Sequence, residues 1–341
     1  MNSITEQPLL TIAIPTYNGS KTICNMMSLL LEQYDSRVEI LVSDNCSTDI
    51  TPEIIENYRK KYPFIRYIRN DSNIGADANY LQCMRMATGK FIHLLSDDDI
   101  MCEGELSKVL DFLDNNKDVT LVYLYTKGFR GRYVNIGSCS TATKQPSNDI
   151  CTTDKKVFMD YAGYYWGFMT SFVIAKCKFD KIHNPEQYYG TYWLQSYIHI
   201  LCCADKDDKV GVISYPCIGA GIYVNVNNFD CSLVDGTNYR AMLDFAINEG
   251  GFDKQQLEKL FKWRIIFLGR HAIIKEKAAG TKKTSKIGLF KHTWKYPTAW
   301  VKLYPFFLIP KFICRIAMNH YRSRRQMDMD VTVNREGDQK S

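Results

Sequence analysis

The first 125 residues alternate between short apolar runs and segments in which apolar residues recur every three or four positions. The runs predict five strands and the periodic segments predict four helices. The strands are expected at Leu9–Pro15, Val38–Asp44, Phe64–Arg69, Lys90–Leu95 and Val119–Tyr125, and the helices at Ser20–Gln33, Thr51–Lys61, Ala76–Ala87 and Glu103–Asn115. Such alternation is typical of an α/β fold, here a doubly wound, mostly parallel sheet with helices on both faces.

The pattern weakens after about Gly128. Gly128–Ile150 is rich in Gly, Ser and Thr and predicts a loop or an irregular hairpin. The remaining elements are expected as helices at Asp154–Tyr161 and Tyr192–Cys203, a strand at Gly167–Ala175, two strands within Val210–Val226 around Pro216, and mainly helix in Asn238–Lys277. The polar end of the chain, Asp328–Ser341, has no pattern and predicts disorder.

Charge is distributed unevenly along the chain. Lys254–Gln326 contains 18 Lys and Arg against two acids, a balance of +16, so the rest of this chain of net charge +6 carries −10. An acidic body with a basic helical extension predicts two surfaces with different partners.

The spacing of the cysteines and histidines indicates reduced thiols and argues against a zinc site. The 12 cysteines include no C-x-x-C pair, and the N-terminal segment is polar, so we expect reduced thiols in a cytosolic protein. The six histidines form no pair at helical or finger spacing, which argues against a zinc site.

Polar and acidic residues follow four of the expected strands, at Pro15–Gly19, Ser43–Asp49, Asn70–Gly75 and Ser96–Asp99. Because ligands of parallel sheets bind beyond the carboxyl ends of the strands, this edge is the expected binding site. The alternative is that these loops are polar only because Asx residues favour turns and helix caps.

Asp97, Asp98 and Asp99 place three adjacent carboxylates at one strand end. Neighbouring carboxylates at roughly 6 Å repel by about 3 kcal/mol at an effective dielectric near 20, so the cluster favours a compensating cation. Mg²⁺ and Mn²⁺ prefer such oxygen ligands and keep positions open for phosphate oxygens. A solvated turn that caps the following helix is the alternative.

No P-loop and no G-x-G-x-x-G motif is present, so a diphosphate would have to be held through the metal. Asp44, at the end of the second expected strand, is a candidate to accept hydrogen bonds from a base edge, since a carboxylate at a buried strand end needs donors. An Asx-turn is the alternative for this residue.

These segments together resemble family 2 glycosyltransferases of the GT-A fold. The resemblance rests on Ile14–Asn18, Leu41–Asp49, Asn73–Gly75 with Asn79, and Ala87–Ile92 leading into Ser96–Asp99, and it covers about the first 115 residues. Ser96 departs from the family pattern, in which many members begin the motif with Asp, and Ala78 stands where many have Arg.

The resemblance implies a role for each matching residue. It implies that Pro15, Thr16, Tyr17 and Asn18 form the first nucleotide-contacting loop, that Asp44 contacts the base, and that Asn73 and Gly75 lie in the loop that closes over the nucleotide. It also implies that Asp97 serves the ribose or the first metal shell, and that Asp98 and Asp99 hold Mn²⁺ or Mg²⁺.

The implied activity is inverting transfer of a sugar from a nucleotide-diphosphate sugar. The finer resemblance is to the abequosyltransferase-like subgroup, which adds sugars, including deoxysugars, to bacterial O-antigen or capsule intermediates. The implied mechanism has a carboxylate remove the proton from the acceptor hydroxyl. Such a base should exist, because general base help is worth about 10²–10⁴ in rate. Glu186 is the nearest acid to the expected position and is our candidate, with a solvated first-turn acid as the alternative. His199 lies on an apolar helix and is expected in the core.

The basic extension suggests a second partner. Trp294–Met318 mixes aromatic and aliphatic residues with Lys and Arg, and its apolar runs are too short to span a bilayer. We expect an in-plane membrane contact, without nucleic acid, that brings the site near a lipid-linked oligosaccharide acceptor. A tail that simply packs on the body is the alternative. The expected location is the cytoplasm, peripheral at the inner face of the cell membrane.

The expected regions are a nucleotide-sugar-binding half at residues 1–125, an acceptor-binding half at 126–237, a basic helical region at 238–326 and a disordered tail at 327–341. Two other functions stay open. One is a catalytically inactive nucleotide-sugar-binding module, because the Glu-Asp pair usual in relatives is missing. The other is a sugar-phosphate nucleotidyltransferase, which would need a Gly-rich loop with Arg that Pro15–Thr22 lacks.

Overall fold

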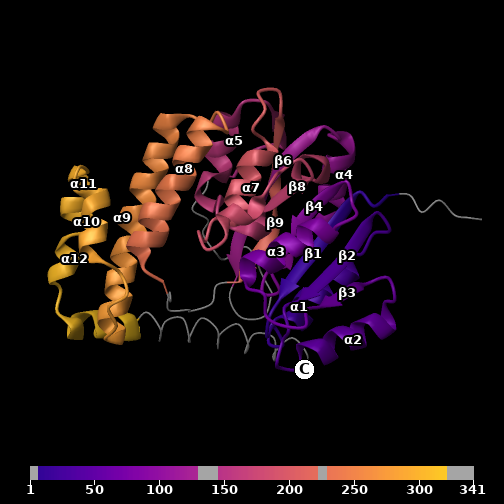
Figure 1. Cartoon of the computed structure of the whole chain (residues 1–341), viewed down its shortest axis with the longest axis horizontal. Coiled ribbons are helices and arrows are strands. Elements are labelled where there is room, and N and C mark those ends of the chain that lie inside the picture. The colour runs from indigo at the N-terminus through magenta and orange to yellow at the C-terminus, as the bar shows by residue number, and fades with distance from the viewer. Residues whose placement is uncertain (1–6, 130–144, 222–228, 321–341) are drawn as a thin grey trace, which may run out of the picture. The chain divides into compact units, whose positions relative to one another are not determined.

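The structure, a computed structural model, describes residues 7–129, 145–221 and 229–320. These residues form two compact units (Figure 1). The first unit contains the described residues up to 221 together with Asn248–Phe252, and the second contains the other described residues from 229 onward. The predicted disordered tail at 327–341 and most of the predicted loop Gly128–Ile150 lie outside the described residues.

The first unit is built on one sheet of nine strands, counted over the described residues. The strands are β1 (Leu10–Thr16), β2 (Val38–Asp44), β3 (Arg66–Arg69), β4 (Phe91–Leu94), β5 (Ile100–Met101), β6 (Val119–Phe129), β7 (Ile150–Thr152), β8 (Phe172–Ala175) and β9 (Lys209–Gly221). Their order is β3-β2-β1-β4-β8-β6-β9-β5, with β7 also paired to β9. Strands β1 to β4 are parallel, as predicted, whereas β8 runs antiparallel to β4 and β6.

Helices cover this sheet because its strands are apolar on both faces. Every residue of β1 and of β4 is buried, although successive side chains point to opposite faces. The helices of the unit are α1 (Ile23–Glu32), α2 (Thr51–Lys61), α3 (Ala76–Met86), α4 (Glu105–Asn115), α5 (Lys155–Ala162), α6 (Lys176–Phe179) and α7 (Leu194–Cys202), with 3₁₀ turns at Gly163–Tyr165, Met169–Ser171 and Pro185–Tyr188. Helix α3 packs on β1, β2 and β4, and α4 packs on β9. The predicted α/β architecture is confirmed.

The predicted interruption between two strands at Pro216 is wrong. Val210–Val226 was expected to form two strands around Pro216, but β9 runs continuously through this proline. Its register against β6 shifts between Ile213 and Ile218, which face Leu124 and Thr126. The proline thus lies in an irregularity of the ladder, where a missing N–H costs no regular hydrogen bond.

The second unit is helical. Its elements are a π-helical segment (Ser232–Asn238), α8 (Tyr239–Asn248), α9 (Lys254–Ala279), α10 (Lys286–Thr293), α11 (Pro297–Lys302) and α12 (Pro305–Leu308), and residues 311–320 are also helical. Helix α9 begins where Asp253 accepts a hydrogen bond from Gln256 N and ends at Gly280, whose φ of 77° suits glycine. Helices α10, α11 and α12 pack against α9, and the predicted helical extension is confirmed. Across the three described ranges, no helix is both long and apolar enough to cross a membrane.

Candidate functional site

The four polar loops predicted from the sequence do meet at one edge of the sheet. Thr16, the last residue of β1, is paired with Asp44, the last residue of β2, and Asp44 is paired with Arg69 at the end of β3. On the other side of β1, Ala13 is paired with Leu94 at the end of β4. The strand order therefore reverses between β1 and β4, and open parallel sheets bind ligands at such a reversal.

Asn18 ties the loop after β1 to the loop after β2. Its Oδ1 accepts a hydrogen bond from Thr48 N at 2.8 Å, and its own N–H donates to Ser47 Oγ at 2.9 Å. The φ of 56° at Asn18 is in the left-handed region, which Asn tolerates better than most residues. Tyr17 next to it is 48% exposed, so its ring is available to a ligand. Pro15 is buried within β1.

Thr16 ties the same loop to the acidic loop after β4. Its hydroxyl donates a hydrogen bond to Asp97 Oδ2. Gly19 lies directly against this pair: a Cβ there would overlap the Asp97 carboxylate and come within 2.6 Å of Thr16 Oγ1. The close approach of the two loops therefore requires glycine at position 19.

Asp44 has no exposed area and is bonded within the protein. Its Oδ1 accepts from Ser47 N at 2.8 Å, its Oδ2 accepts from Tyr67 Oη at 2.9 Å, and Arg69 Nε lies 3.3 Å from Oδ2. The carboxylate thus has the donors that a buried strand-end acid needs. A base could reach it only if Tyr67 or Arg69 gave up its contact.

Asn45 organises the loop that was predicted to close over a nucleotide. Its Nδ2 donates to Asn73 Oδ1 at 3.0 Å and to Gly75 O at 3.2 Å, and its Oδ1 accepts from Ile74 N at 2.9 Å. Asn73 also accepts a hydrogen bond from Gly75 N. Gly75, with a φ of 87°, is the residue that precedes α3. Asn73 and Gly75 are exposed, so the loop presents its backbone outward. Asn45 belongs to the motif Leu41–Asp49 but was not predicted as a site residue.

The three aspartates of the acidic loop have different partners. Asp97 accepts from Thr16, and Asp98 accepts from the hydroxyl of Ser96. Asp99 is only 2% exposed and accepts from Thr170 Oγ1 at 2.6 Å and from Gly221 N at 2.9 Å. Each oxygen of Asp99 therefore already has a protein donor. Asp97 and Asp98 lie nearer the surface.

Burial and mutual repulsion make this loop costly to keep fully ionised. Burial, together with the charge of Asp98, raises the pKa of Asp97 to about 6, although the Thr16 hydroxyl opposes the shift. The same two causes raise the pKa of Asp99 to about 7. Carboxylates in this state gain from a cation at their side.

A metal ion would need ligands from outside the protein here. Among the described residues, no group of three or more His, Cys, Asp or Glu side chains is placed to hold a metal ion by itself. Hard cations that bind through one or two carboxylates complete their shell with waters and substrate phosphates. The carboxylate oxygens of Asp97 and Asp98 fit a metal of that kind.

A cavity of about 410 Å³ adjoins the loop of Asn73 and Gly75, since Gly75 is one of the residues that line it. It is lined by the start of α3 and by the segment after the 3₁₀ turn Pro185–Tyr188, with residues Ile74–Ala78, Tyr189, Gly190 and Tyr192. Asp77 Oδ2 bridges the two segments by accepting from Gly190 N at 2.8 Å. Burial, then the charges of Asp77, Asp97 and Asp98, raise the pKa of Tyr80 to about 12, so the carboxylates of the cavity and of the acidic loop act on the same phenol.

Glu186, the predicted base, lies on the turn Pro185–Tyr188 and accepts a hydrogen bond from Arg85 of α3. This contact with Arg85 lowers the pKa of Glu186. The cavity lining includes Asp77 and does not include Glu186. His199 is buried against Phe172, with ring centroids 4.5 Å apart, and burial lowers its pKa to about 3.

Comparison with known proteins gives a consistent result. The family model described as glycosyl transferase family 2 matches residues 11–173. Abequosyltransferase RfbV of Salmonella typhimurium is 27% identical over 203 residues, which cover 56% of this chain and 59% of that protein. The putative teichuronic acid biosynthesis glycosyltransferase TuaG of Bacillus subtilis is 29% identical over 107 residues, which cover 31% of this chain and 42% of TuaG. The chain thus spans less than two thirds of the length of either relative.

A crystal structure of S. aureus TarS 1–349 in complex with UDP has a TM-score of 0.56 and 16% identity, and the match covers 80% of this chain and 75% of that chain. This likeness concerns the fold alone. Taken together, the loop motifs, the shared strand edge and the family match show that this chain contains a glycosyl transferase family 2 domain, which spans residues 11–173.

Proposed function

We propose that this chain is an inverting glycosyltransferase that moves a deoxyhexose from a nucleotide-diphosphate sugar to a lipid-linked precursor of O-antigen or capsule. The observation that carries this proposal is the meeting of four polar loops, one of them acidic, at the point where the strand order reverses. The name abequosyltransferase supports the deoxyhexose, TuaG supports an envelope polysaccharide, and the UDP in the TarS crystal supports the nucleotide.

The donor would lie over β1 and β2. Thr16, Tyr17 and Asn18 would form one wall, and the exposed backbone of Asn73 and Gly75 would form the other. Pro15 and the buried carboxylate of Asp44 would lie beneath the nucleotide, at the ends of β1 and β2. If Asp44 contacted the base, that contact would replace its bond to Tyr67 or Arg69. Uridine is the base we propose to test first.

A bound Mn²⁺ or Mg²⁺ would supply Lewis acidity that stabilises the departing diphosphate. In our proposal Asp98 holds it, helped by Asp97, whose position the Thr16 hydroxyl fixes. Asp99 was also predicted as a ligand. Because Thr170 and Gly221 already engage both its oxygens, we propose that Asp99 chiefly holds the loop in place.

The acceptor would enter the 410 Å³ cavity between the start of α3 and the segment at 189–192. The proton acceptor proposed from sequence is Glu186. We now place Asp77 ahead of it, because Asp77 lines this cavity and has one oxygen without a described partner, whereas Glu186 is paired with Arg85. The rings of Tyr189 and Tyr192, 38% and 55% exposed, would stack on an acceptor sugar.

The second unit would bring the chain to the inner face of the cell membrane. Its exposed side chains combine large apolar groups with cations. The apolar ones are Ile287, Phe290, Trp294, Trp300, Val301, Leu308, Phe312, Ile313 and Ile316. Aromatic residues among Lys and Arg are typical of segments that lie in the plane of an anionic membrane. This contact would keep the transferase near a lipid-linked acceptor.

A thermal-shift screen of UDP-, GDP-, CDP- and dTDP-sugars tests the donor class, followed by transfer to a lipid-linked acceptor with the sugar that stabilises the protein most. We expect one nucleotide to stand out and the product to have inverted anomeric configuration. Donor binding without transfer and without slow donor hydrolysis would instead identify a catalytically inactive binding module.

A further inference from the structure

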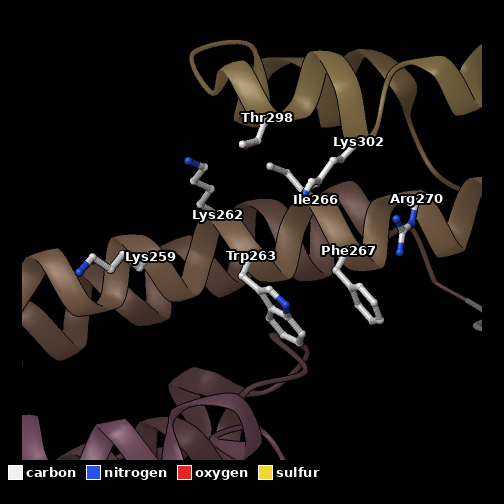
Figure 2. A pocket seen from close by; sticks show the side chains of 8 residues that line it. All are labelled: Lys259, Lys262, Trp263, Ile266, Phe267, Arg270, Thr298 and Lys302. Atoms are coloured by element: carbon white, nitrogen blue, oxygen red, sulfur yellow. The ribbon is translucent and has the colours of Figure 1, made fainter. Parts of the chain in front are cut away.

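Helices α9 and α11 of the second unit enclose a cavity of about 350 Å³ that the transfer reaction does not use. Figure 2 shows Thr298 and Lys302 reaching from α11 toward α9, where Lys262 and Ile266 face them. The other lining residues are Lys259, Trp263, Phe267 and Arg270. The α9 residues recur at intervals of three and four, so they share one face of the helix. A site of this size is within the range of small-ligand pockets.

Four cations line this cavity: Lys259, Lys262, Arg270 and Lys302. Within residues 229–320 no carboxylate forms an ion pair with any of them, whereas nearby Lys295 pairs with Glu258. Four like charges around one cavity repel one another, and an anion in the cavity would relieve this repulsion. The charge pattern therefore favours a negatively charged ligand.

Thr298 adds an independent sign of a ligand. Its hydroxyl is buried and has no hydrogen-bond partner among the described residues. A buried hydroxyl without a partner has lost its hydrogen bonds to water and gained none in return, so natural proteins rarely keep one without a reason. Because the hydroxyl lines a cavity of cations, an anionic oxygen is the acceptor that fits it.

The rest of the lining is apolar. Trp263 and Phe267 are stacked, with centroids 5.2 Å apart, and Ile266 lies between the two helices. Phe267 is 38% exposed, and Trp300 and Val301 of α11 are 57% and 73% exposed. A bare phosphate would leave this apolar surface uncovered, whereas a phosphate that carries a hydrocarbon chain would cover it.

We propose that this cavity binds the phosphate of a phosphorylated amphiphile, a lipid phosphate whose chain lies along Trp263 and Phe267. This inference deepens the proposed membrane contact and rests on it, but it is independent of the proposed transfer reaction. The phosphate would accept hydrogen bonds from Thr298 and be neutralised by Lys262, Arg270 and Lys302.

The test is calorimetric titration of the full chain with water-soluble dihexanoyl phosphatidic acid, dihexanoyl phosphatidylcholine and glycerol 3-phosphate. We expect saturable binding of the first and weaker binding of the other two. Thr298→Val, which is nearly isosteric and removes no charge, should weaken binding about tenfold by deleting one charge-assisted hydrogen bond. Since this hydroxyl has no protein partner, the melting temperature should not fall.

A matched pair of variants separates the cavity from surface charge. Lys262→Gln/Lys302→Gln removes two cavity cations, and Lys282→Gln/Lys291→Gln removes two exposed cations elsewhere in the unit. We expect the first pair to weaken binding clearly more than the second. Equal losses in the two pairs, an unchanged affinity in Thr298→Val, or equally tight binding of glycerol 3-phosphate would overturn the proposal. The thermal shift caused by nucleotide sugars, measured in the same variants, reports separately on the transfer site.

Discussion

Gly19 is the residue on which the contact between the first loop and the acidic loop depends most directly. The Thr16 hydroxyl and the Asp97 carboxylate meet at the place where a side chain at position 19 would be. The polar segment Pro15–Gly19 includes this glycine, but nothing in the segment indicates why it is needed. The reason becomes visible only when residues 16 and 19 meet residue 97, which is far away in the chain.

We expect Gly19→Ala to displace Asp97 and to lower transfer activity by about 10²-fold, as misplacement of a positioned group by about 1 Å can do. The stability cost should be about 1–3 kcal/mol, because the new methyl group overpacks the loop. Melting temperature and initial rates measure the two effects. Glu32→Ala, at an exposed position of α1 outside the Thr16 and Asp97 contact, is the control and should behave like the parent. Unchanged rates in Gly19→Ala would show that the contact is not needed.

The proton acceptor is the residue that the sequence and the structure assign differently, as Glu186 and Asp77. Asp77→Asn can keep the hydrogen bond from Gly190 N through its amide oxygen but can no longer accept a proton. We expect it to lower kcat by about 10²–10⁴-fold with little change in donor binding. Glu186→Gln, an equally conservative change of a carboxylate paired with Arg85, should stay close to the parent.

The reverse pattern of rates would identify Glu186 as the acceptor, as the sequence suggested. Loss of transfer in neither variant would exclude both acids. Steady-state kinetics with varied acceptor concentration at saturating donor distinguishes these outcomes, because a lost base lowers kcat rather than raising KM.

Sequence reasoning identified the residues that belong to compact local motifs and missed those defined by distant partners. The segments around Asn18, Asp44, Asn73 and Asp98 were found because each follows a strand within a few residues. Thr170 was missed because its partner Asp99 is 71 positions away and no motif surrounds it. The burial of Asp44 was expected, but its partners Tyr67 and Arg69 and the pairing of Glu186 were equally invisible, since they depend on side chains from other elements.

At the level of elements, strands and helices with a strong period were predicted best. Val38–Asp44 and Thr51–Lys61 have the bounds predicted for them, because each is a regular element with a sharp polar boundary. The two- and three-residue strands β5 and β7 were not predicted, since runs this short have no periodicity. They form only because β9 offers them a partner.

Glu258 links three parts of the helical unit and makes the stability of this unit depend on pH. Burial alone would raise its pKa, but hydrogen bonds from Tyr296 and Arg240 and the charges of Arg240 and Lys295 lower it to about 2, from an ordinary value of 4.5. Because the folded pKa is depressed, this contribution to stability is fully present above pH 4.5 and is lost as the pH falls toward 2.

We therefore expect Glu258→Gln to lower the free energy of unfolding at neutral pH and to converge with the parent between pH 4.5 and 2. Thermal melts of the two proteins across this range measure the difference. Glu249→Gln, at an exposed acid, is the control and should follow the parent throughout. A Glu258→Gln deficit that does not shrink on acidification would mean that packing, rather than charge, accounts for the effect.

At the scale of the whole molecule, two compact units correspond to two kinds of sequence. The sheet unit contains the family domain, and its strand and helix alternation made the fold predictable. The helical unit was predicted as a basic, mainly helical extension, but the helices after Lys277 were not predicted one by one, because charge and composition indicate a surface without fixing its helices. The cavity between α9 and α11 could not be foreseen, since it depends on how these helices pack.

The central claim is that the strand edge of the family domain binds a nucleotide-diphosphate sugar through a metal held at Asp98. The most direct measurement compares donor-induced thermal shifts and transfer rates of the parent and Asp98→Asn, with and without Mn²⁺. We predict that Asp98→Asn melts at or above the temperature of the parent when no ligand is present, since the Asp98 side chain bonds only to Ser96 among the described residues and its charge repels Asp97 and Asp99. It should lose the Mn²⁺-dependent part of the shift and most of its transfer activity. Full activity in Asp98→Asn, or a parent shift that is indifferent to Mn²⁺, would contradict the claim.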